Sequence, residues 1–280
     1  MSGHRESLDK LETESQSSGA PDLSRMTVYQ IMKAMNRADS SVPAAVHRSL
    51  RQICEAAEAV SSTVNNGGRV FYIAAGTGGR IAMQDAAELP PTFGFRPEVF
   101  QAIIAGGARA RAKAIENAED DEKAAAAVLK RRKAGQRDTV IGITASGRTP
   151  FVVSALRYAS AAGCRTIGLS SNAGSPITKI VDMPVVIETG PELIAGSTRL
   201  KAGTAQKLVL NMISTYAGIR AGKVVGNMMV GMKATNEKLR NRALSIVTEL
   251  TGASREKARK ALVKFDYDIS KSVDHLKNSP

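Results

Sequence analysis

The sequence predicts an α/β protein in which a parallel sheet is covered by helices on both faces and is followed by a small helical bundle. Three observations support this class. Short apolar runs rich in Val and Ile alternate with segments of helical spacing, which is typical of parallel strands buried on both faces. Two of these runs lead through glycine-containing turns directly into a helix. After the last long helix, three short helical stretches follow with no strand pattern between them.

The first part of the chain is expected to be helical. Residues 1–24 carry no apolar core of a signal peptide and are predicted to be flexible. From Met26 to about Asn66, apolar residues recur at three- and four-residue spacing, with a break at 39–43. The run Asn-Asn-Gly-Gly at 65–68 predicts the end of the last of these helices.

The remaining elements follow from the same patterns. The expected strands are 69–75, 99–106, 139–145, 165–170 and 183–189. Helical segments are expected at about 118–134, 149–162 and 199–223, and as three short stretches within 236–277. The predicted regions are a flexible segment (1–24), an α/β domain with an N-terminal helical arm (25–235) and a C-terminal three-helix unit (236–280).

Composition narrows the class of partner. The chain of 280 residues carries 39 basic and 26 acidic side chains, which gives a net charge of +13. Its basic residues are not interleaved with aromatic ones, so the excess charge favours anionic metabolites over nucleic acid. No apolar run approaches the roughly 20 residues that span a bilayer, which predicts a cytoplasmic protein with no membrane partner.

Cysteine and histidine are sparse. Cys54 and Cys164 lack the number and spacing of a disulfide framework or a zinc site, and three histidines are scattered along the chain. The sequence therefore predicts no metal site and argues against a Ser-His-Asp triad.

The stretch after the first predicted strand is a candidate anion site. Its candidate binding residues are Gly76, Thr77, Gly78, Gly79 and Arg80. Glycines between a strand and a helix let backbone N–H groups approach an anion, and the helix dipole favours negative charge there. The spacing fits neither a dinucleotide fingerprint nor a nucleotide-binding P-loop. A plain tight turn without a ligand remains an open alternative.

A second turn of the same kind follows the predicted strand at 139–145. Ser146, Gly147, Arg148 and Thr149 occupy the place where a phosphate would meet a helix N-terminus. Ser146 and Thr149 are also suited to capping that helix, which leaves a purely structural interpretation open. Because ligands collect at the carboxyl ends of parallel strands, two such turns in one sheet favour a binding site.

The start of the long helix near residue 199 offers a third candidate anion site. Its candidate residues are Ser197, Thr198, Arg199 and Lys201. Hydroxyl and cationic groups at a helix N-terminus suit a phosphate or a carboxylate. Capping by Ser197 or Thr198 is the structural alternative.

Two acidic positions are candidates for proton transfer. Leu89 precedes Pro90 and is disfavoured in a helix, so the helix that follows the first turn is expected to end at about Glu88. A carboxylate there would face the negative end of the helix dipole, which favours its protonated form and suits a general acid. Glu119 lies in the acidic run 116–122, which by itself is typical of a solvated face.

Longer motifs connect these residues to a known family. The stretches AAGTGGRIAMQDAAELPPTFG, IIAGG, ENAEDD, ITASGRTPFV, GPELIAGSTRLKAGTAQKLVLNMIST, GKVVGNMMV and ATNEKL resemble, in order and spacing, those of the N-acetylmuramic acid 6-phosphate etherases. The resemblance runs from about Leu11 to the C-terminus. It implies a three-layer α/β sandwich, the sugar isomerase fold, in a family that resembles the glucokinase regulatory proteins of animals. It also implies a homodimer with sites between subunits and no cofactor.

The resemblance implies an activity as well. Members of this family are lyases that cleave the lactyl ether at C3 of the sugar, yielding N-acetylglucosamine 6-phosphate and D-lactate. Glu88, in the pattern Glu-x-Pro-Pro, would protonate the departing lactate oxygen, and Glu119, in the pattern Ala-Glu-Asp, would take the C2 proton. The anion sites would hold the sugar phosphate or the lactyl carboxylate. The alternative is a non-catalytic sugar-phosphate regulator or sensor.

The chain departs from the family at a few positions. Gly78 stands where the family has a serine that should contact the substrate, and Gly231 stands where it has an aspartate. An asparagine of the family's N-terminal segment is missing, and residues 251–273 resemble a ubiquitin-associated-type three-helix unit. Because a sensor would not need two proton-transferring carboxylates, Glu88 and Glu119 together favour catalysis.

Overall fold

The computed structural model of the protein describes Ser15 and residues 22–278. The flexible segment expected at 1–24 lies largely outside these residues. A short 3-10 turn, η2 (Leu23–Arg25), precedes three successive helices. They are α1 (Val28–Asp39), α2 (Val42–Arg48) and α3 (Leu50–Asn65). Ser40 and Ser41 separate α1 from α2, so the predicted break at this point is confirmed.

Five parallel strands form one sheet in the order β2-β1-β3-β4-β5. The strands are β1 (Val70–Ala74), β2 (Phe100–Ile104), β3 (Thr139–Ile143), β4 (Arg165–Ser170) and β5 (Met183–Val186). Each lies within one of the apolar runs predicted as strands. The strand order reverses between the neighbours β1 and β3, where ligands collect in open α/β sheets. The two glycine-containing turns follow these two strands.

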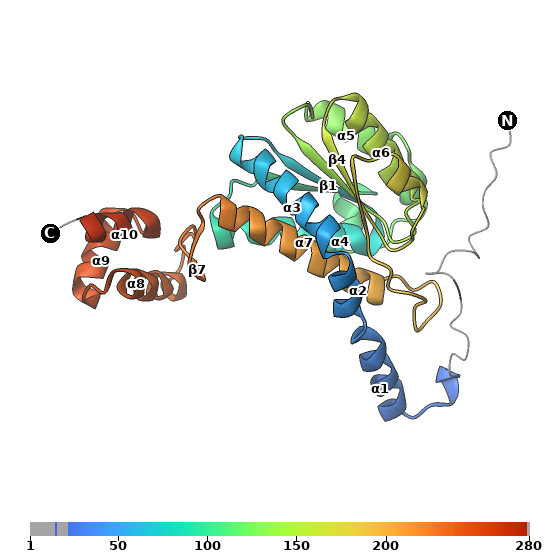
Figure 1. Ribbon diagram of the computed structural model, residues 1–280, viewed down its shortest axis with the longest axis horizontal. Coiled ribbons are helices and arrows are strands. Elements are labelled where there is room, and N and C mark those ends of the chain that lie inside the picture. Colours follow the sequence, from blue (N-terminus) through green and yellow to red (C-terminus); the bar gives the residue numbers. More distant parts are fainter. Residues whose placement is uncertain (1–14, 16–21, 279–280) are drawn as a thin grey trace.

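Helices cover both faces of the sheet, as the sequence predicts, and Figure 1 shows the resulting layers. One layer contains α2, α3, α4 (Gly76–Phe93) and α7 (Lys201–Arg220). The other contains α5 (Ala124–Arg131) and α6 (Pro150–Ala161). The 3-10 turns η3 (Gly107–Arg111) and η4 (Ala118–Asp120) connect β2 to α5, and η5 (Pro176–Lys179) precedes β5.

The central strand β1 shows how the pattern of side chains builds these layers. Val70, Tyr72 and Ala74 pack into the core beneath α3 and α7, whereas Phe71 and Ile73 pack into the core beneath α5 and α6. All five are fully buried. A continuous apolar run is therefore required, because alternate residues of the strand face two different cores.

The expected end of α4 at Glu88 is wrong. The helix continues through Pro90 and Pro91 to Phe93, and Gly94 then adopts a left-handed conformation and donates its N–H to the Pro90 carbonyl. The two prolines remove two helical hydrogen bonds. Leu89 and Phe93 are nonetheless buried in the core beneath the sheet, and this packing holds the last turn in place.

The C-terminal region forms a separate helical group, as predicted. A small hairpin of β6 (Val224–Val225) and β7 (Met228–Met229) leads from α7 to α8 (Glu237–Thr251), α9 (Arg255–Lys264) and α10 (Ile269–Asn278). These helices share a core of their own. Asn236 and Ser254 cap α8 and α9 through their side chains. In Figure 1 the group lies at the far end of α7, away from the sheet.

Candidate active site

A cavity of about 300 Å³ lies at the carboxyl ends of β1 and β3. Its lining comprises Ala75, Gly76, Thr77, Gly78, Glu119, Ile143, Thr144, Ala145, Ser146, Thr149, Thr198 and Gln206. Residues from both glycine-containing turns, from η4 and from the loop before α7 therefore meet around one space. The structure brings together seven of the sequence-predicted site residues here.

The glycines of the first turn serve three different purposes. Gly76 has a φ of +51°, which glycine adopts without strain, and it lets the chain enter α4 directly after β1. A Cβ atom on Gly79 would lie 2.4 Å from Cγ1 of Ile104, so this glycine permits close packing of α4 on β2. Gly78 borders the cavity, where a Cβ atom would lie 3.1 Å from Oε1 of Gln206.

The second turn presents a cluster of hydroxyl groups to the cavity. Oγ1 of Thr144 lies 2.8 Å from Oγ1 of Thr149 and 3.2 Å from Oγ of Ser146. The backbone N–H of Arg148 donates to Oγ of Ser146 at 3.2 Å. Thr149 is the N-cap residue of α6, but its side chain makes no capping hydrogen bond. These hydroxyls are therefore available to a ligand at the N-terminus of α6.

The expected anion site at the start of α7 is already filled by the chain itself. The buried carboxylate of Glu192 accepts hydrogen bonds from the N–H groups of Lys201 at 3.0 Å and Ala202 at 2.9 Å. The ammonium group of Lys201 donates to the Thr189 carbonyl at 2.6 Å and is also buried. Lys201 thus has a structural position, and Thr198 is the residue of this segment that lines the cavity.

Other sequence-predicted binding residues lie around the cavity without lining it. They are Gly79, Arg80, Gly147, Arg148, Ser197, Arg199 and Lys201. Arg80 donates to the carbonyl of Lys113 at 3.1 Å, which ties α4 to the segment between η3 and η4. Gly147 has a φ of +69°, and a Cβ atom there would lie 2.1 Å from Oγ of Ser175. Arg199 is exposed.

Glu88 lies outside the cavity that contains Glu119. It is an exposed residue of a second cavity, of about 260 Å³, which α4 and α7 form between them. Glu88 follows Gly76 by twelve positions on α4, a distance of about 18 Å along the helix axis. Within one subunit, the two carboxylates therefore belong to different sites.

A buried carboxylate stands beside Glu88 in the second cavity. Asp85 accepts hydrogen bonds from the hydroxyls of Tyr72 at 2.8 Å and Ser214 at 2.9 Å, which links α4 to β1 and α7. Burial raises the pKa of Asp85 to about 6, although these two hydrogen bonds and the charge of Lys207 act in the opposite direction. Burial also raises the pKa of Tyr72, and the charge of Asp85 adds to this effect.

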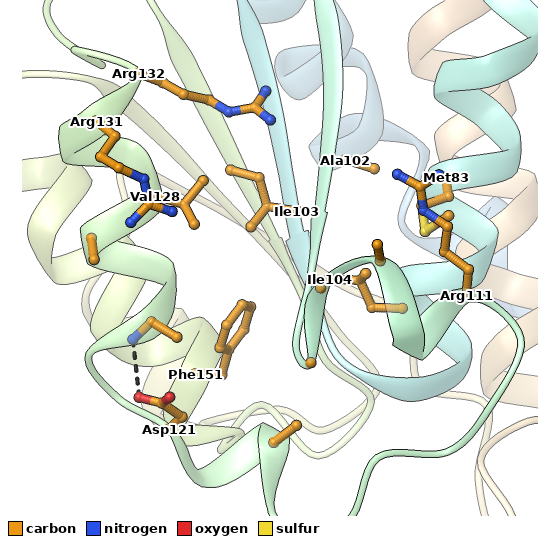
Figure 2. Close-up of a pocket in the computed structure, with 16 residues that line it drawn as sticks. Met83, Ala102, Ile103, Ile104, Arg111, Asp121, Val128, Arg131, Arg132 and Phe151 are labelled. Atoms are coloured by element: carbon orange, nitrogen blue, oxygen red, sulfur yellow. Dashed lines mark hydrogen bonds between the residues drawn. The ribbon is translucent and has the colours of Figure 1, made fainter.

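A third cavity lies beside the outer edge of the sheet. A cavity of about 440 Å³ follows the outer edge of β2, where Figure 2 shows Ile103 and Val128 with Arg131 and Arg132 near them. None of the site residues predicted from the sequence is among the described residues that line it. The 3-10 turn η4 separates it from the first cavity, since Ala118 lines this space and Glu119 lines the other.

Sequence reasoning missed four residues of these sites. Thr144 and Gln206 line the first cavity, Asp85 lines the second, and Glu192 caps α7. A signal for Gln206 was present, because it interrupts a buried helical stripe that includes Ala202, Ala205 and Val209. The contact of Glu192 with the start of α7 crosses a loop, which no local capping pattern predicts.

Two further properties concern only the part of the chain that the structure describes. No helix within it is both long and apolar enough to cross a membrane. Within the same residues, no three His, Cys, Asp or Glu side chains gather as metal ligands.

The fold and its two parts match known families. A family model for the glucokinase regulatory protein N-terminal SIS domain matches residues 52–160, and one for the C-terminal lid domain of that protein matches 226–280. The phosphoheptose isomerase of Neisseria gonorrhoeae superposes with a TM-score of 0.54 at 17% identity, covering 68% of this chain and 98% of that chain. A phosphoheptose isomerase from Francisella tularensis superposes with a TM-score of 0.52 at 18% identity, covering 69% of this chain and 100% of that chain. These similarities establish the sugar isomerase fold.

Curated relatives named N-acetylmuramic acid 6-phosphate etherase match almost the whole chain. The one from Clostridium botulinum (strain Okra / Type B1) is 44% identical over 273 residues, which cover 98% of this chain and 90% of the relative. The one from Geobacillus thermodenitrificans (strain NG80-2) is 50% identical over 251 residues, which cover 90% of this chain and 85% of the relative. The chain therefore belongs to the N-acetylmuramic acid 6-phosphate etherase family.

Proposed function

We propose that this protein is a carbon–oxygen lyase that cleaves the C3 lactyl ether of N-acetylmuramic acid 6-phosphate. The products are N-acetylglucosamine 6-phosphate and D-lactate. The observation that carries the proposal is the identity of 44% to the etherase of Clostridium botulinum across 98% of this chain. The cavity at the carboxyl ends of β1 and β3 supports it, because helix N-termini and hydroxyl groups there suit a sugar phosphate.

The proposed reaction is an elimination followed by addition of water. In the ring-opened sugar, Glu119 takes the proton from C2, the C2–H electrons form a C2=C3 double bond, and the C3–O bond breaks. Glu88 gives its proton to the departing lactate oxygen. Water then adds to C3 while C2 regains a proton. A well-placed acid or base typically contributes about 10²–10⁴-fold to the rate.

We propose that the two carboxylates meet across a homodimer. Glu88 and Glu119 lie in separate cavities of one subunit, so Glu88 would act in the first cavity of the second subunit. Exposed apolar side chains on α1 support an association of this kind. Val28, Tyr29 and Met32 are 76%, 75% and 53% exposed, and α1 extends away from the sheet in Figure 1.

The function is tested by incubating the pure protein with N-acetylmuramic acid 6-phosphate and assaying D-lactate. Release of D-lactate that depends on Glu119, and is lost in Glu119→Gln, is the expected result. The same variant should no longer exchange the C2 proton with solvent. If the parent protein binds the sugar phosphate but releases no lactate, the non-catalytic regulator becomes the better interpretation.

Mixing two inactive variants tests the shared site. Glu88→Gln and Glu119→Gln subunits, unfolded together and refolded, should form mixed dimers that each contain one intact site. About a quarter of the parental activity should return, because half of the dimers are mixed and each has one of two sites. If both carboxylates acted within one subunit, the mixture would remain inactive.

The C-terminal unit also has a role in this proposal. We expect residues 236–280 to act as a lid, because 226–280 match a family model described as a lid domain.

Since acid–base chemistry moves all the protons, the reaction requires no metal or cofactor, and dialysis against EDTA should leave lactate release unchanged. We further propose a cytoplasmic location.

A further inference from the structure

Lys207 on α7 is the cationic side chain among the described residues that line the second cavity. Its ammonium group forms no hydrogen bond or ion pair with another residue in the part of the chain that the structure describes. The neighbouring carboxylate of Asp85 is buried and already accepts hydrogen bonds from Tyr72 and Ser214. The positive charge of Lys207 is therefore available to a ligand in this cavity.

The rest of the lining gives this cavity a polar and an apolar part. Asn211 lies one helical turn after Lys207 on α7, so the two side chains are neighbours on one face of the helix. The carboxamide of Asn211 adds N–H donors beside the ammonium group. From α4, Glu88 lines the same cavity, and Ile81 and Leu89 supply apolar surface. Hydrogen-bond donors, a carboxyl group and apolar side chains therefore surround one small space.

The covalent structure of a lactyl ether decides what must lie beside the proton donor. Its ether oxygen, its carboxylate and its methyl group are all bonded to the same carbon atom. When Glu88 gives its proton to that oxygen, the lactyl carboxylate is only a few ångströms away. The group that binds this carboxylate must therefore line the same cavity as Glu88, whichever subunits contribute to the site.

Charge gives a second reason to expect a cation at this place. A lactyl anion that enters the second cavity meets the carboxyl groups of Asp85 and Glu88, which repel it when they are ionised. The ammonium group of Lys207 offsets this repulsion. The start of α7 is less suitable, because the carboxylate of Glu192 already accepts hydrogen bonds from the backbone N–H groups there.

We propose that Lys207 binds the lactyl carboxylate of the substrate, so that the second cavity is the site of the lactyl group and selects for its negative charge. Asn211 donates a hydrogen bond to the same carboxylate, and the apolar surface of Ile81 and Leu89 receives the methyl group. The inference rests on the proposed function, because it takes Glu88 as the proton donor to the ether oxygen.

Binding measurements test this role without requiring turnover. Calorimetric titration compares N-acetylmuramic acid 6-phosphate with N-acetylglucosamine 6-phosphate, which lacks the lactyl group, in a Glu119→Gln background that should leave the first ligand intact. Lys207→Met should weaken binding of the first ligand by about 10–100-fold and of the second only slightly. Lys207→Arg, which keeps the charge, should retain most of the affinity. Lys130→Met, at an exposed lysine of α5 outside both cavities, is the matched control.

Three outcomes would overturn the assignment. In the first, Lys207→Met keeps the parental preference for the ligand with the lactyl group. In the second, this variant loses affinity for both ligands equally while its melting temperature stays at the parental value. In the third, the protein with Lys207 intact shows no preference between the ligands.

Failure of the proposed reaction gives a different result. A parent protein that prefers the lactyl ligand through Lys207 but releases no D-lactate would refute the reaction and leave the binding role of Lys207 intact. A parent protein that releases D-lactate, while Lys207→Met binds both ligands as before, would refute the role of Lys207 alone.

Discussion

The two ends of α4 contribute to two cavities of different chemistry. At its start, backbone N–H groups and the hydroxyls of the neighbouring turn surround a space of about 300 Å³. Twelve residues on, Asp85, Glu88 and Lys207 place charged side chains around a space of about 260 Å³. The backbone and hydroxyl donors of the first cavity suit the binding of an anion, and Glu119 is the carboxylate among its lining residues, whereas three charged side chains line the second cavity.

Ligand binding and protonation of the leaving group therefore depend on different regions of the molecule, although one sequence motif contains residues of both regions. The turns around the first cavity should determine which sugar phosphate binds, its Glu119 should determine how readily the C2 proton leaves, and Glu88 of the second cavity should determine how readily the ether oxygen is protonated. Substitutions in the two regions are therefore expected to change different measured quantities.

Glu88→Gln is expected to have the largest effect on turnover. Loss of the proton donor should lower kcat for lactate release by about 10²–10⁴-fold. Exchange of the C2 proton with solvent should persist, because the proposed base for that proton is Glu119, in the other cavity. Steady-state kinetics and proton exchange observed by NMR measure the two effects. A variant that kept most of its lactate release would remove Glu88 from the mechanism.

Asp85→Asn is expected to stabilise the protein at neutral pH. Because the folded-state pKa of Asp85 is raised from 3.8 to about 6, stability falls as the pH rises from about 4 to about 6 and stays level above. The neutral amide should avoid this loss, on the order of 2–3 kcal/mol at pH 7.5. Melting temperatures of parent and variant, measured from pH 4 to pH 8, should diverge with rising pH. Parallel curves would contradict the buried, ionised carboxylate.

Ser146→Ala should weaken binding at the first cavity without a new chemical defect. Loss of a hydrogen bond to a charged phosphate costs about 1.5–3 kcal/mol, so affinity should fall about tenfold or more. A substrate analogue without the 6-phosphate should bind poorly to the parent and respond little to the change. Titration of both ligands measures the effect. If Ser146→Ala weakens the binding of both ligands equally, Ser146 has only a structural role in the turn.

Gly78→Ser should have the smallest effect and should improve binding. The added hydroxyl offers one hydrogen bond to the substrate, worth about 1 kcal/mol. The Cβ atom would lie 3.1 Å from Oε1 of Gln206 and 3.3 Å from Cγ2 of Ile143, and the φ of Gly78 is not in the left-handed region. These contacts are tighter than a Cβ atom normally makes, so the neighbouring side chains must shift by a few tenths of an ångström and the melting temperature should fall slightly. The ratio of kcat/KM for variant over parent measures the effect, and a value well below one would point to a different substrate.

The fold could be predicted from the sequence because its signals are local and repeated. Each strand, such as Val70–Ala74, is a short apolar run that the helical segments separate, and the burial of both its faces follows directly. The end of α4 could not be predicted by a local rule. The conformational preference before Pro90 acts against the helix, but the buried Leu89 and Phe93 favour it more strongly.

The sequence predicts which turns meet at the first cavity, but less of the geometry around it. Glycine-containing turns after parallel strands predict that Gly76 and Ser146 lie close together, because the strands end at the same edge. The cap formed by Glu192 and the network of Asp85 depend on contacts between distant segments. The separation of Glu88 from Glu119 follows from the length of α4, which a resemblance between motifs does not reveal.

The length of α4 also limits how this protein can evolve. Adding one residue to the helix would advance Glu88 by about 1.5 Å and turn it by about 100° around the axis, so the carboxylate would face another direction. An insertion or deletion between Gly76 and Glu88 would therefore misplace the carboxylate, and a new substrate cannot be accommodated in this way. Adaptation must proceed by exchanging side chains at a fixed spacing.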